Sequence, residues 1–213
     1  MSVAIFDLDG TLVDSREDLH CAVAHALREL RLPPRSLEEV TAFVGEGARR
    51  LLSRAVAPEE HLVDRALALW RAHYEEHLLD HTRLYPGIAA ALAGARLPLA
   101  VHTNKPGAMA RRILSGLGVL DRFSAVVGGD EAPRKPDPTG TLEILARLGS
   151  RAEEAVFIGD SLVDRATAAA AGVRFLPVAW GFTPAGELSS GPAEPLAKDA
   201  ADLLPWLEAA PAP

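Results

Sequence analysis

Hydrophobic and polar residues follow two different patterns along this chain, and each pattern predicts a different kind of structure. An apolar run over 3–6 has the length of a buried strand and is followed at once by Asp7 and Asp9. From about residue 15 to residue 82 the apolar positions recur at helical spacing, and no segment has the pattern of a strand. The first part of the chain is therefore expected to form one strand and then a block of helices.

Residues that favour helix ends divide this block into separate helices. Ser15 and Ser36 stand at N-cap positions, and the Pro-Pro pair at 33–34 separates the two helices that they begin. Further helices are expected over 48–56 and from Pro58 onward.

After residue 83 the chain alternates between helical and strand patterns. The expected strands are 97–102, 125–127, 155–158 and 173–178, and the expected helices are 88–95, 107–117, 139–148, 162–171 and a last one near 203–207. Such alternation predicts a parallel sheet, to which the strand at 3–6 must also belong. We therefore expect an α/β fold, with a Rossmann-like core of residues 1–14 and 83–213 and an inserted all-helical domain of residues 15–82.

Each strand of the expected sheet is followed by polar residues. Ligands bind beyond the carboxyl ends of the strands in such sheets, so these residues are expected to meet in one site. They are Asp7, Asp9 and Gly10, then Thr103, Asn104 and Lys105, then Lys135, and finally Asp160 and Asp164. Asp7 and Asp9 point the same way if the segment is extended, and two such carboxylates repel each other unless a cation lies between them. A hard cation with oxygen ligands, most simply Mg²⁺, fits this cluster.

The composition narrows the classes of function. The chain has 213 residues, 48% of them apolar, and a net charge of −7, which argues against nucleic acid as a partner because a phosphate backbone requires a basic face. No apolar stretch is long enough to span a bilayer, and the start has no signal-peptide pattern, so we expect a soluble cytoplasmic protein without a membrane partner. The one cysteine, Cys21, lies in a helical pattern and is expected to be buried. Monomer and homodimer both remain open.

The order of these motifs resembles the haloacid dehalogenase (HAD) superfamily, in its phosphatase branch. That family has Asp-x-Asp-Gly-Thr, a Thr or Ser after the second strand, a Lys, and Gly-Asp-x-x-x-Asp. The corresponding positions in this chain are Asp7 to Thr11, Thr103, Lys135, and Gly159-Asp160 to Asp164. The segments 103–106, 129–130 and 134–138 further resemble the phosphoglycolate-phosphatase-like subgroup, and the helical insertion resembles its cap domain.

The resemblance implies a Mg²⁺-dependent phosphatase that hydrolyses small phosphate monoesters, with 2-phosphoglycolate as a candidate substrate. Asp7 would be the nucleophile that forms an aspartyl-phosphate, and Asp9 the general acid and base. Thr103, the backbone of Asn104 and Gly10 would hold the phosphoryl group, and Lys135 would neutralise it together with Asp7.

The resemblance also implies the ligands of the metal and a place for substrate recognition. Mg²⁺ would be bound by Asp7, by Asp9 through its backbone carbonyl and by Asp160, and Asp164 would either bind it directly or lie just behind the direct ligands. In the loop 45–50 of the helical insertion, Arg49 and Arg50 are candidates to bind a substrate carboxylate.

Several alternatives remain open at this stage. A β-phosphoglucomutase-like phosphotransferase, a pyrophosphatase or a nucleotidase of the same superfamily would share these motifs, and a phospho-accepting signalling module or an inactive binding protein represents a class without enzymatic activity. Lys105 could lie at the rim of the site or on the solvated surface. His102 could be a core residue or contact the site.

Overall fold

The strand predicted at 3–6 is β1, and it lies at the centre of a five-stranded parallel sheet with the order β5-β4-β1-β6-β7. The structure, a computed structural model, describes residues 2–188 and 195–208. The strands of the sheet are β1 (Val3–Phe6), β4 (Leu99–His102), β5 (Phe123–Val127), β6 (Ala155–Gly159) and β7 (Arg174–Pro177). The expected α/β fold with a parallel central sheet is confirmed.

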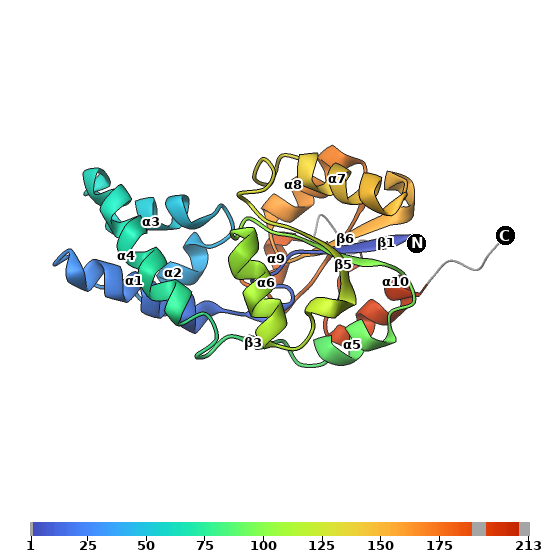
Figure 1. Ribbon diagram of the computed structural model, residues 1–213, viewed down its shortest axis with the longest axis horizontal. Coiled ribbons are helices and arrows are strands. Elements are labelled where there is room, and N and C mark those ends of the chain that lie inside the picture. Colours follow the sequence, from blue (N-terminus) through green and yellow to red (C-terminus); the bar gives the residue numbers. More distant parts are fainter. Residues whose placement is uncertain (1, 189–194, 209–213) are drawn as a thin grey trace.

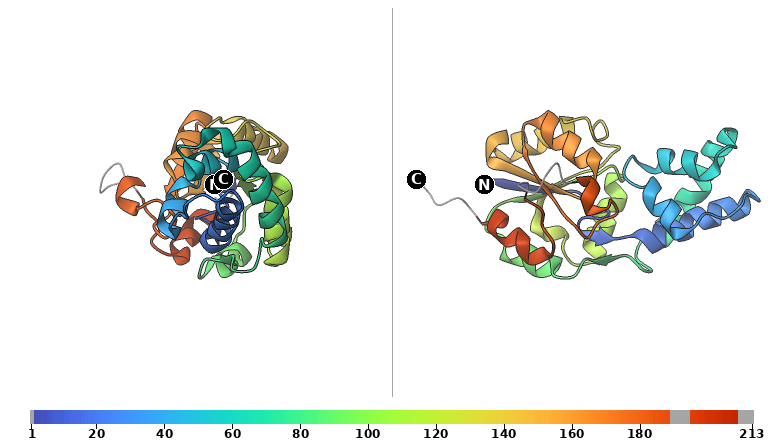
Figure 2. Two further views of the ribbon diagram at one scale, coloured as in Figure 1. Left: turned by 90° about the vertical axis from the view of Figure 1, so that its left-hand side faces the viewer. Right: turned by 180° about the vertical axis from the view of Figure 1, so that it is seen from behind.

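Alternate residues of β1 face opposite layers of helices, as a buried central strand requires. Val3 and Ile5 belong to a core cluster with residues of α7 and α8, whereas Ala4 and Phe6 belong to a cluster with residues of α5, α6 and α10. Figures 1 and 2 show these two layers on the two faces of the sheet. Their bounds are α5 (Ile88–Gly94), α6 (Gly107–Gly116), α7 (Thr139–Leu148), α8 (Leu162–Ala171) and α10 (Leu204–Leu207).

The block between β1 and the rest of the sheet is helical, as expected, and we refer to α1–α4 as the helical insertion. Its helices are α1 (Arg16–Glu29), α2 (Leu37–Phe43), α3 (Ala48–Val56) and α4 (Val63–Glu76), preceded by the 3₁₀ turn η1 (Glu60–Leu62). Figure 1 shows the insertion beside the sheet layers and not on top of them. The helix expected from Pro58 begins only at Val63, because the backbone of 59–62 forms tighter turns first.

The two connections to the helical insertion run side by side. β2 (Val13–Asp14) and β3 (Arg83–Leu84) form a short antiparallel pair that the sequence did not predict. The buried carboxylate of Asp18 accepts hydrogen bonds from both backbone N–H groups of 81–82 and from the hydroxyl of Thr82 at 2.6 Å. These contacts join the first turn of α1 to the segment that leads back to the sheet.

One local prediction in α1 was wrong, and another was confirmed only for the position of the residue. Cys21 is exposed, because it lies on the side of α1 that faces away from the buried residues Leu19, Ala22 and Val23. Ser15 occupies the N-cap position, but its side chain makes no capping hydrogen bond and is directed to Asp9. The remaining short elements of the described residues are η2 (Leu120–Arg122), η3 (Ala152–Glu154), α9 (Ala185–Leu188) and η4 (Ala200–Leu203).

Candidate active site

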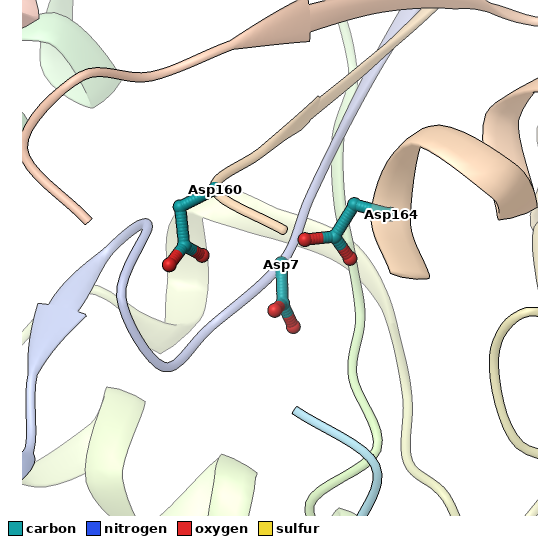
Figure 3. A group of neighbouring side chains, drawn as sticks. All are labelled: Asp7, Asp160 and Asp164. Carbon is teal, nitrogen blue, oxygen red and sulfur yellow. The ribbon is translucent and has the colours of Figure 1, made fainter. Parts of the chain in front are cut away.

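Three buried carboxylates meet beyond the carboxyl ends of β1 and β6. Asp7 follows β1, Asp160 follows β6, and Asp164 lies in the first turn of α8 (Figure 3). One carboxylate oxygen from each lies within 4.8 Å of the others. The sheet therefore brings together three of the four residues predicted as metal ligands.

The carboxylates of this cluster are buried close together, so their negative charges require a nearby cation. Burial raises the pKa of Asp7 above its usual value, and the nearby charge of Asp164 raises it further. Burial and the charges of Asp164 and Asp7 likewise raise the pKa of Asp160. Asp7 Oδ1 is buried, and its close polar partner is Lys135 Nζ at 2.8 Å. A divalent cation with oxygen ligands fits this donor set, because it offsets the repulsion that raises both pKa values.

The backbone at Gly10 leaves room for the side chain of Asp160. Gly10 has φ +85°, and a Cβ at this position would lie 2.2 Å from Asp160 Oδ2. Thr11 Oγ1 donates to Asp160 Oδ1, and the backbone N–H of Phe182 donates to Oδ2, both at 2.8 Å. The N–H of Gly10 itself donates to the carbonyl of Val13. Gly10 therefore contributes to the predicted site by letting the Asp160 carboxylate lie close to the backbone. Its own N–H group is hydrogen-bonded to Val13.

Lys135 bridges two of the three carboxylates. Its ammonium nitrogen lies 2.6 Å from Asp164 Oδ1 and 2.8 Å from Asp7 Oδ1, and the side chain is buried. Burial alone would lower the pKa of Lys135, but the charges of Asp164 and Asp7 outweigh burial and raise it. Lys135 therefore carries a positive charge beside Asp7. Asp164 also accepts from Ser161 Oγ at 2.6 Å in a capping box that begins α8.

The side chain of Asp9 lies apart from the three-carboxylate cluster and has different partners. Ser15 Oγ donates to Asp9 Oδ1 at 2.6 Å. Lys105 Nζ donates to both carboxylate oxygens, at 2.8 and 2.9 Å, and also to the hydroxyl of Tyr74 at 2.8 Å. Tyr74 belongs to α4, so this network joins the sheet to the helical insertion. Lys105 is buried and paired, so of the two positions left open for it the structure excludes the solvated surface and places it at the site.

Thr103 and Asn104 follow β4 and face the same region. Thr103 is buried, and its hydroxyl accepts from the backbone N–H of Lys105 at 3.2 Å. The side chain of Asn104 bridges three segments: it accepts from the N–H of Lys135 and donates to the carbonyl oxygens of Lys135 and Gly45. Its amide group thus holds the loop of Lys135 and a loop of the insertion in place.

A small cavity of about 40 Å³ lies between the sheet and the helical insertion. Asp7, Asp9 and residues 103–106 line it from the sheet side. From the insertion it is lined mainly by apolar and glycine residues, namely Leu19, Val44, Gly45, Gly47, Ala48, Leu51 and Trp70. The indole N–H of Trp70 is buried and has no hydrogen-bond partner among the described residues. This volume holds about three water molecules, so the cavity suits a small group.

The structure places the two predicted arginines of the insertion outside this cavity. Arg49 Nη1 forms an ion pair with Asp64 at 2.5 Å, and Arg50 Nε lies 3.8 Å from Glu46. Both line a separate hollow together with Arg134. Their role in binding substrate stays a prediction that this arrangement does not favour.

The structure answers the question about His102 and reveals residues that the sequence did not indicate. His102 is buried and contacts Thr141 Oγ1 at 2.9 Å, and burial lowers its pKa to about 3, so it is a neutral core residue. Ser15, Tyr74 and Trp70 lie at the site without having been predicted. Only Ser15, six residues after Asp9, carried a local signal; Tyr74 and Trp70 lie in the apolar pattern of an ordinary core helix.

Comparisons with known proteins agree with this geometry. A family model described as haloacid dehalogenase-like hydrolase matches residues 4–178. A phosphoglycolate phosphatase of Cereibacter sphaeroides is 44% identical over 184 residues, which cover 82% of this chain and 84% of the relative. Another, of Rhodospirillum rubrum, is 41% identical over 216 residues and covers 95% and 89%.

The structural comparison points the same way. The crystal structure of a predicted phosphoglycolate phosphatase from Haemophilus somnus matches with a TM-score of 0.89 and 30% identity, over 97% of each chain.

Within residues 2–188 and 195–208, no helix is both long and apolar enough to cross a membrane.

Proposed function

Because this chain belongs to the haloacid dehalogenase-like hydrolase family, we propose that it is a Mg²⁺-dependent phosphatase of small phosphate monoesters, with 2-phosphoglycolate as the first candidate. The observation that carries this proposal is the convergence of Asp7, Asp160 and Asp164 around one small volume, with Lys135 beside them. An anionic phosphoryl group can approach these carboxylates only if cations compensate their charge.

Asp7 is the proposed nucleophile. A carboxylate oxygen of Asp7 attacks phosphorus, and the bond between phosphorus and the ester oxygen breaks, leaving its electron pair on that oxygen. Asp9 gives a proton to the departing oxygen. In the second step Asp9 takes a proton from a water molecule, whose oxygen attacks the aspartyl-phosphate and releases inorganic phosphate and free Asp7.

The residues around Asp7 have separate roles in the proposed reaction. Asp7, Asp160, Asp164 and the backbone carbonyl of Asp9 would hold Mg²⁺, which when bound stabilises negative charge on the phosphoryl oxygens. Lys135 neutralises Asp7 and the phosphoryl group as a point charge. Thr103 and the backbone of Asn104, which line the cavity next to Asp7, hold the phosphoryl oxygens. Gly10 contributes by letting Asp160 approach.

The substrate class follows from the cavity and from the relatives. A cavity of about 40 Å³ favours a leaving group of a few heavy atoms over a nucleoside or a sugar. The two relatives from Cereibacter sphaeroides and Rhodospirillum rubrum are phosphoglycolate phosphatases. We propose that residues 15–82 act as a cap over the site and that residues 1–14 and 83–213 form the catalytic core. The proposed setting is the cytoplasm, where a monomer or homodimer acts on a small phosphorylated metabolite without nucleic acid or a membrane.

Phosphate release in the presence of Mg²⁺ tests the proposal. We expect release from 2-phosphoglycolate to exceed release from sugar phosphates, nucleoside monophosphates and pyrophosphate, and EDTA to remove the activity. Asp7→Asn should abolish turnover while the circular dichroism spectrum stays unchanged. Asp121→Asn makes the same change at an exposed position away from the site and should retain full activity. Turnover by Asp7→Asn, or release that does not require a metal, would overturn the mechanism.

A further inference from the structure

The wall of the cavity that belongs to the helical insertion offers hydrogen-bond donors, and none of the described residues that line it from this side is acidic. Trp70 is one of these residues and is only 2% exposed. Its indole N–H is buried and has no hydrogen-bond partner in the part of the chain that the structure describes. Because a buried donor without an acceptor is unfavourable, an oxygen atom in the adjoining cavity is a suitable partner for it.

The start of α3 contributes further donors to the same wall. Gly47 and Ala48 line the cavity, and Gly47 is the N-cap residue of α3. The first N–H groups of a helix have no partner within the helix, and Gly47 has no side chain that could accept from them. The partial positive charge of a helix N-terminus favours a negatively charged group at this place.

The loop before α3 is fixed close to the phosphoryl site and keeps its own acidic residue out of the cavity. Asn104 Nδ2 donates to the carbonyl oxygen of Gly45 at 2.8 Å, which ties this loop to the sheet side of the site. The carboxylate of Glu46 pairs with Arg54 and lies near Arg50, and Glu46 lines the separate hollow. A negatively charged ligand beside Gly45 is therefore not repelled by Glu46.

The geometry of the proposed reaction places the leaving group against this wall. Asp7 attacks phosphorus from the sheet side, and in such a displacement the attacking and leaving oxygens lie roughly in line with phosphorus. The leaving group therefore extends away from Asp7, toward Trp70 and α3. A cavity of about 40 Å³ allows only a short group between phosphorus and the wall.

We propose that Trp70 and the first turn of α3 bind a carboxylate on the leaving group of the substrate. The indole N–H of Trp70 and the backbone N–H of Ala48 donate to the carboxylate oxygens. The inference rests on the proposed phosphatase function and adds specificity-determining residues to it. It assigns recognition of the carboxylate to neutral donors, so the lysines of the site and the arginines of the insertion keep the ion pairs that the structure shows.

The test compares 2-phosphoglycolate with 2-hydroxyethyl phosphate, an ester of similar size whose leaving group is uncharged. Trp70→Phe removes the indole N–H and keeps an aromatic ring to stack on Tyr74, whose ring centroid lies 4.8 Å away. We expect the ratio of the two kcat/KM values to shift roughly 10- to 100-fold against 2-phosphoglycolate, since a hydrogen bond to a charged group is lost only with that ester. Trp206→Phe makes the same change in α10, outside the cavity lining, and should leave the ratio unchanged.

Ala48→Pro tests the donor at the start of α3. Ala48 is the first residue of this helix, where proline fits because its φ suits a helix and no intrahelical hydrogen bond is lost. Gly47 has ψ 163°, an extended value that suits a residue before proline. We expect the ratio of the two kcat/KM values to shift against 2-phosphoglycolate in this variant as well.

The outcomes separate the inference from the proposed function. If the wild-type protein releases phosphate from neither ester with Mg²⁺, the phosphatase function itself is rejected. An unchanged ratio in folded Trp70→Phe, including an equal loss on both esters, would overturn the inference and leave the phosphatase intact. If circular dichroism shows that Trp70→Phe does not fold, Ala48→Pro decides: a shift against 2-phosphoglycolate supports the inference, and an unchanged ratio overturns it.

Discussion

Gly10 and Asp160 approach each other so closely that no side chain fits between them: a Cβ on Gly10 would lie 2.2 Å from Asp160 Oδ2. The contact joins the loop after β1 to the loop after β6 and fixes Asp160 beside Asp7. Because Gly10 also has φ +85°, both its backbone conformation and its missing side chain are required.

We expect Gly10→Ala to lose nearly all Mg²⁺-dependent activity, because the added methyl group displaces Asp160. The positive φ also costs about 1–3 kcal/mol in folding free energy. Gly118→Ala is the matched control, since Gly118 has φ +71° with nothing within 4 Å of an added Cβ. Urea unfolding should show a loss of stability in both variants, and only Gly10→Ala should lose activity. Wild-type activity in Gly10→Ala would contradict the assignment of Asp160.

Ser15 and Ser36 precede helices in the same way but have different partners, which gives a second prediction. Ser36 accepts from the N–H of Glu39 in a capping box, whereas Ser15 donates to Asp9. Ser36→Ala should lower the free energy of unfolding by about 0.5–2 kcal/mol and leave kcat unchanged. Ser15→Ala should reduce kcat roughly tenfold or more, because the loss of one hydrogen bond to a charged group costs about 1.5–3 kcal/mol.

The two measurements for these variants are urea unfolding and phosphate release. A large loss of stability with full activity in Ser15→Ala would show that Ser15 acts as a helix cap, in contradiction to the hydrogen bond with Asp9.

The sequence was sufficient to predict the sheet and the residues that meet at its edge. The strand at 3–6 and the helices at 48–56, 139–148 and 162–171 have the bounds that their apolar patterns predicted. Asp7 and Asp160 could be predicted as neighbours because parallel strands place their carboxyl ends at one edge.

Features that depend on a single contact between distant segments could not be predicted. The β2–β3 pair has two residues in each strand, which is too short for any periodic pattern. Lys105 and Tyr74 are 31 residues apart, and only the packing of α4 against the sheet edge brings them together. Arg49 and Arg50 follow a glycine loop that suggested substrate contact, but neighbouring acidic residues pair with them. Sequence spacing does not contain this information.

Metal binding should be measurable as a gain in stability. Asp7, Asp160 and Asp164 repel one another when no cation is present, so Mg²⁺ should raise the Tm of the wild-type protein. At roughly 100 times its Kd, a bound ion stabilises the folded state by about 2.7 kcal/mol. For a chain of this size that corresponds to about 5–10 °C.

Asp160→Asn removes one of the repelling charges and one ligand for the metal. In EDTA we expect this variant to be at least as stable as the wild type, and with Mg²⁺ its Tm should not rise. A scanning fluorimetry titration with Mg²⁺ checks both statements. An equal rise in Tm for both proteins would place the metal elsewhere.

Asp18 offers a test of how the helical insertion is attached. Its buried carboxylate accepts from the backbone N–H groups of His81 and Thr82 and from the Thr82 hydroxyl. Asp18→Asn places an N–H₂ group among these donors, so we expect a loss of about 2–3 kcal/mol in unfolding free energy. Glu17→Gln changes the neighbouring, largely exposed carboxylate and should stay within about 0.5 kcal/mol of the wild type.

The contribution of Asp18 should also depend on pH. Burial opposes its ionisation, but hydrogen bonds from Thr82 and His81 outweigh burial and hold the pKa of Asp18 below its usual value. A carboxylate with a depressed pKa stabilises the folded state above its unfolded-state pKa, near 4, and loses that contribution as the pH falls through its folded-state pKa. The difference in unfolding free energy between the wild type and Asp18→Asn should therefore shrink below about pH 4. Urea unfolding across this range measures it, and a difference that grows in acid would contradict the role of the ionised carboxylate.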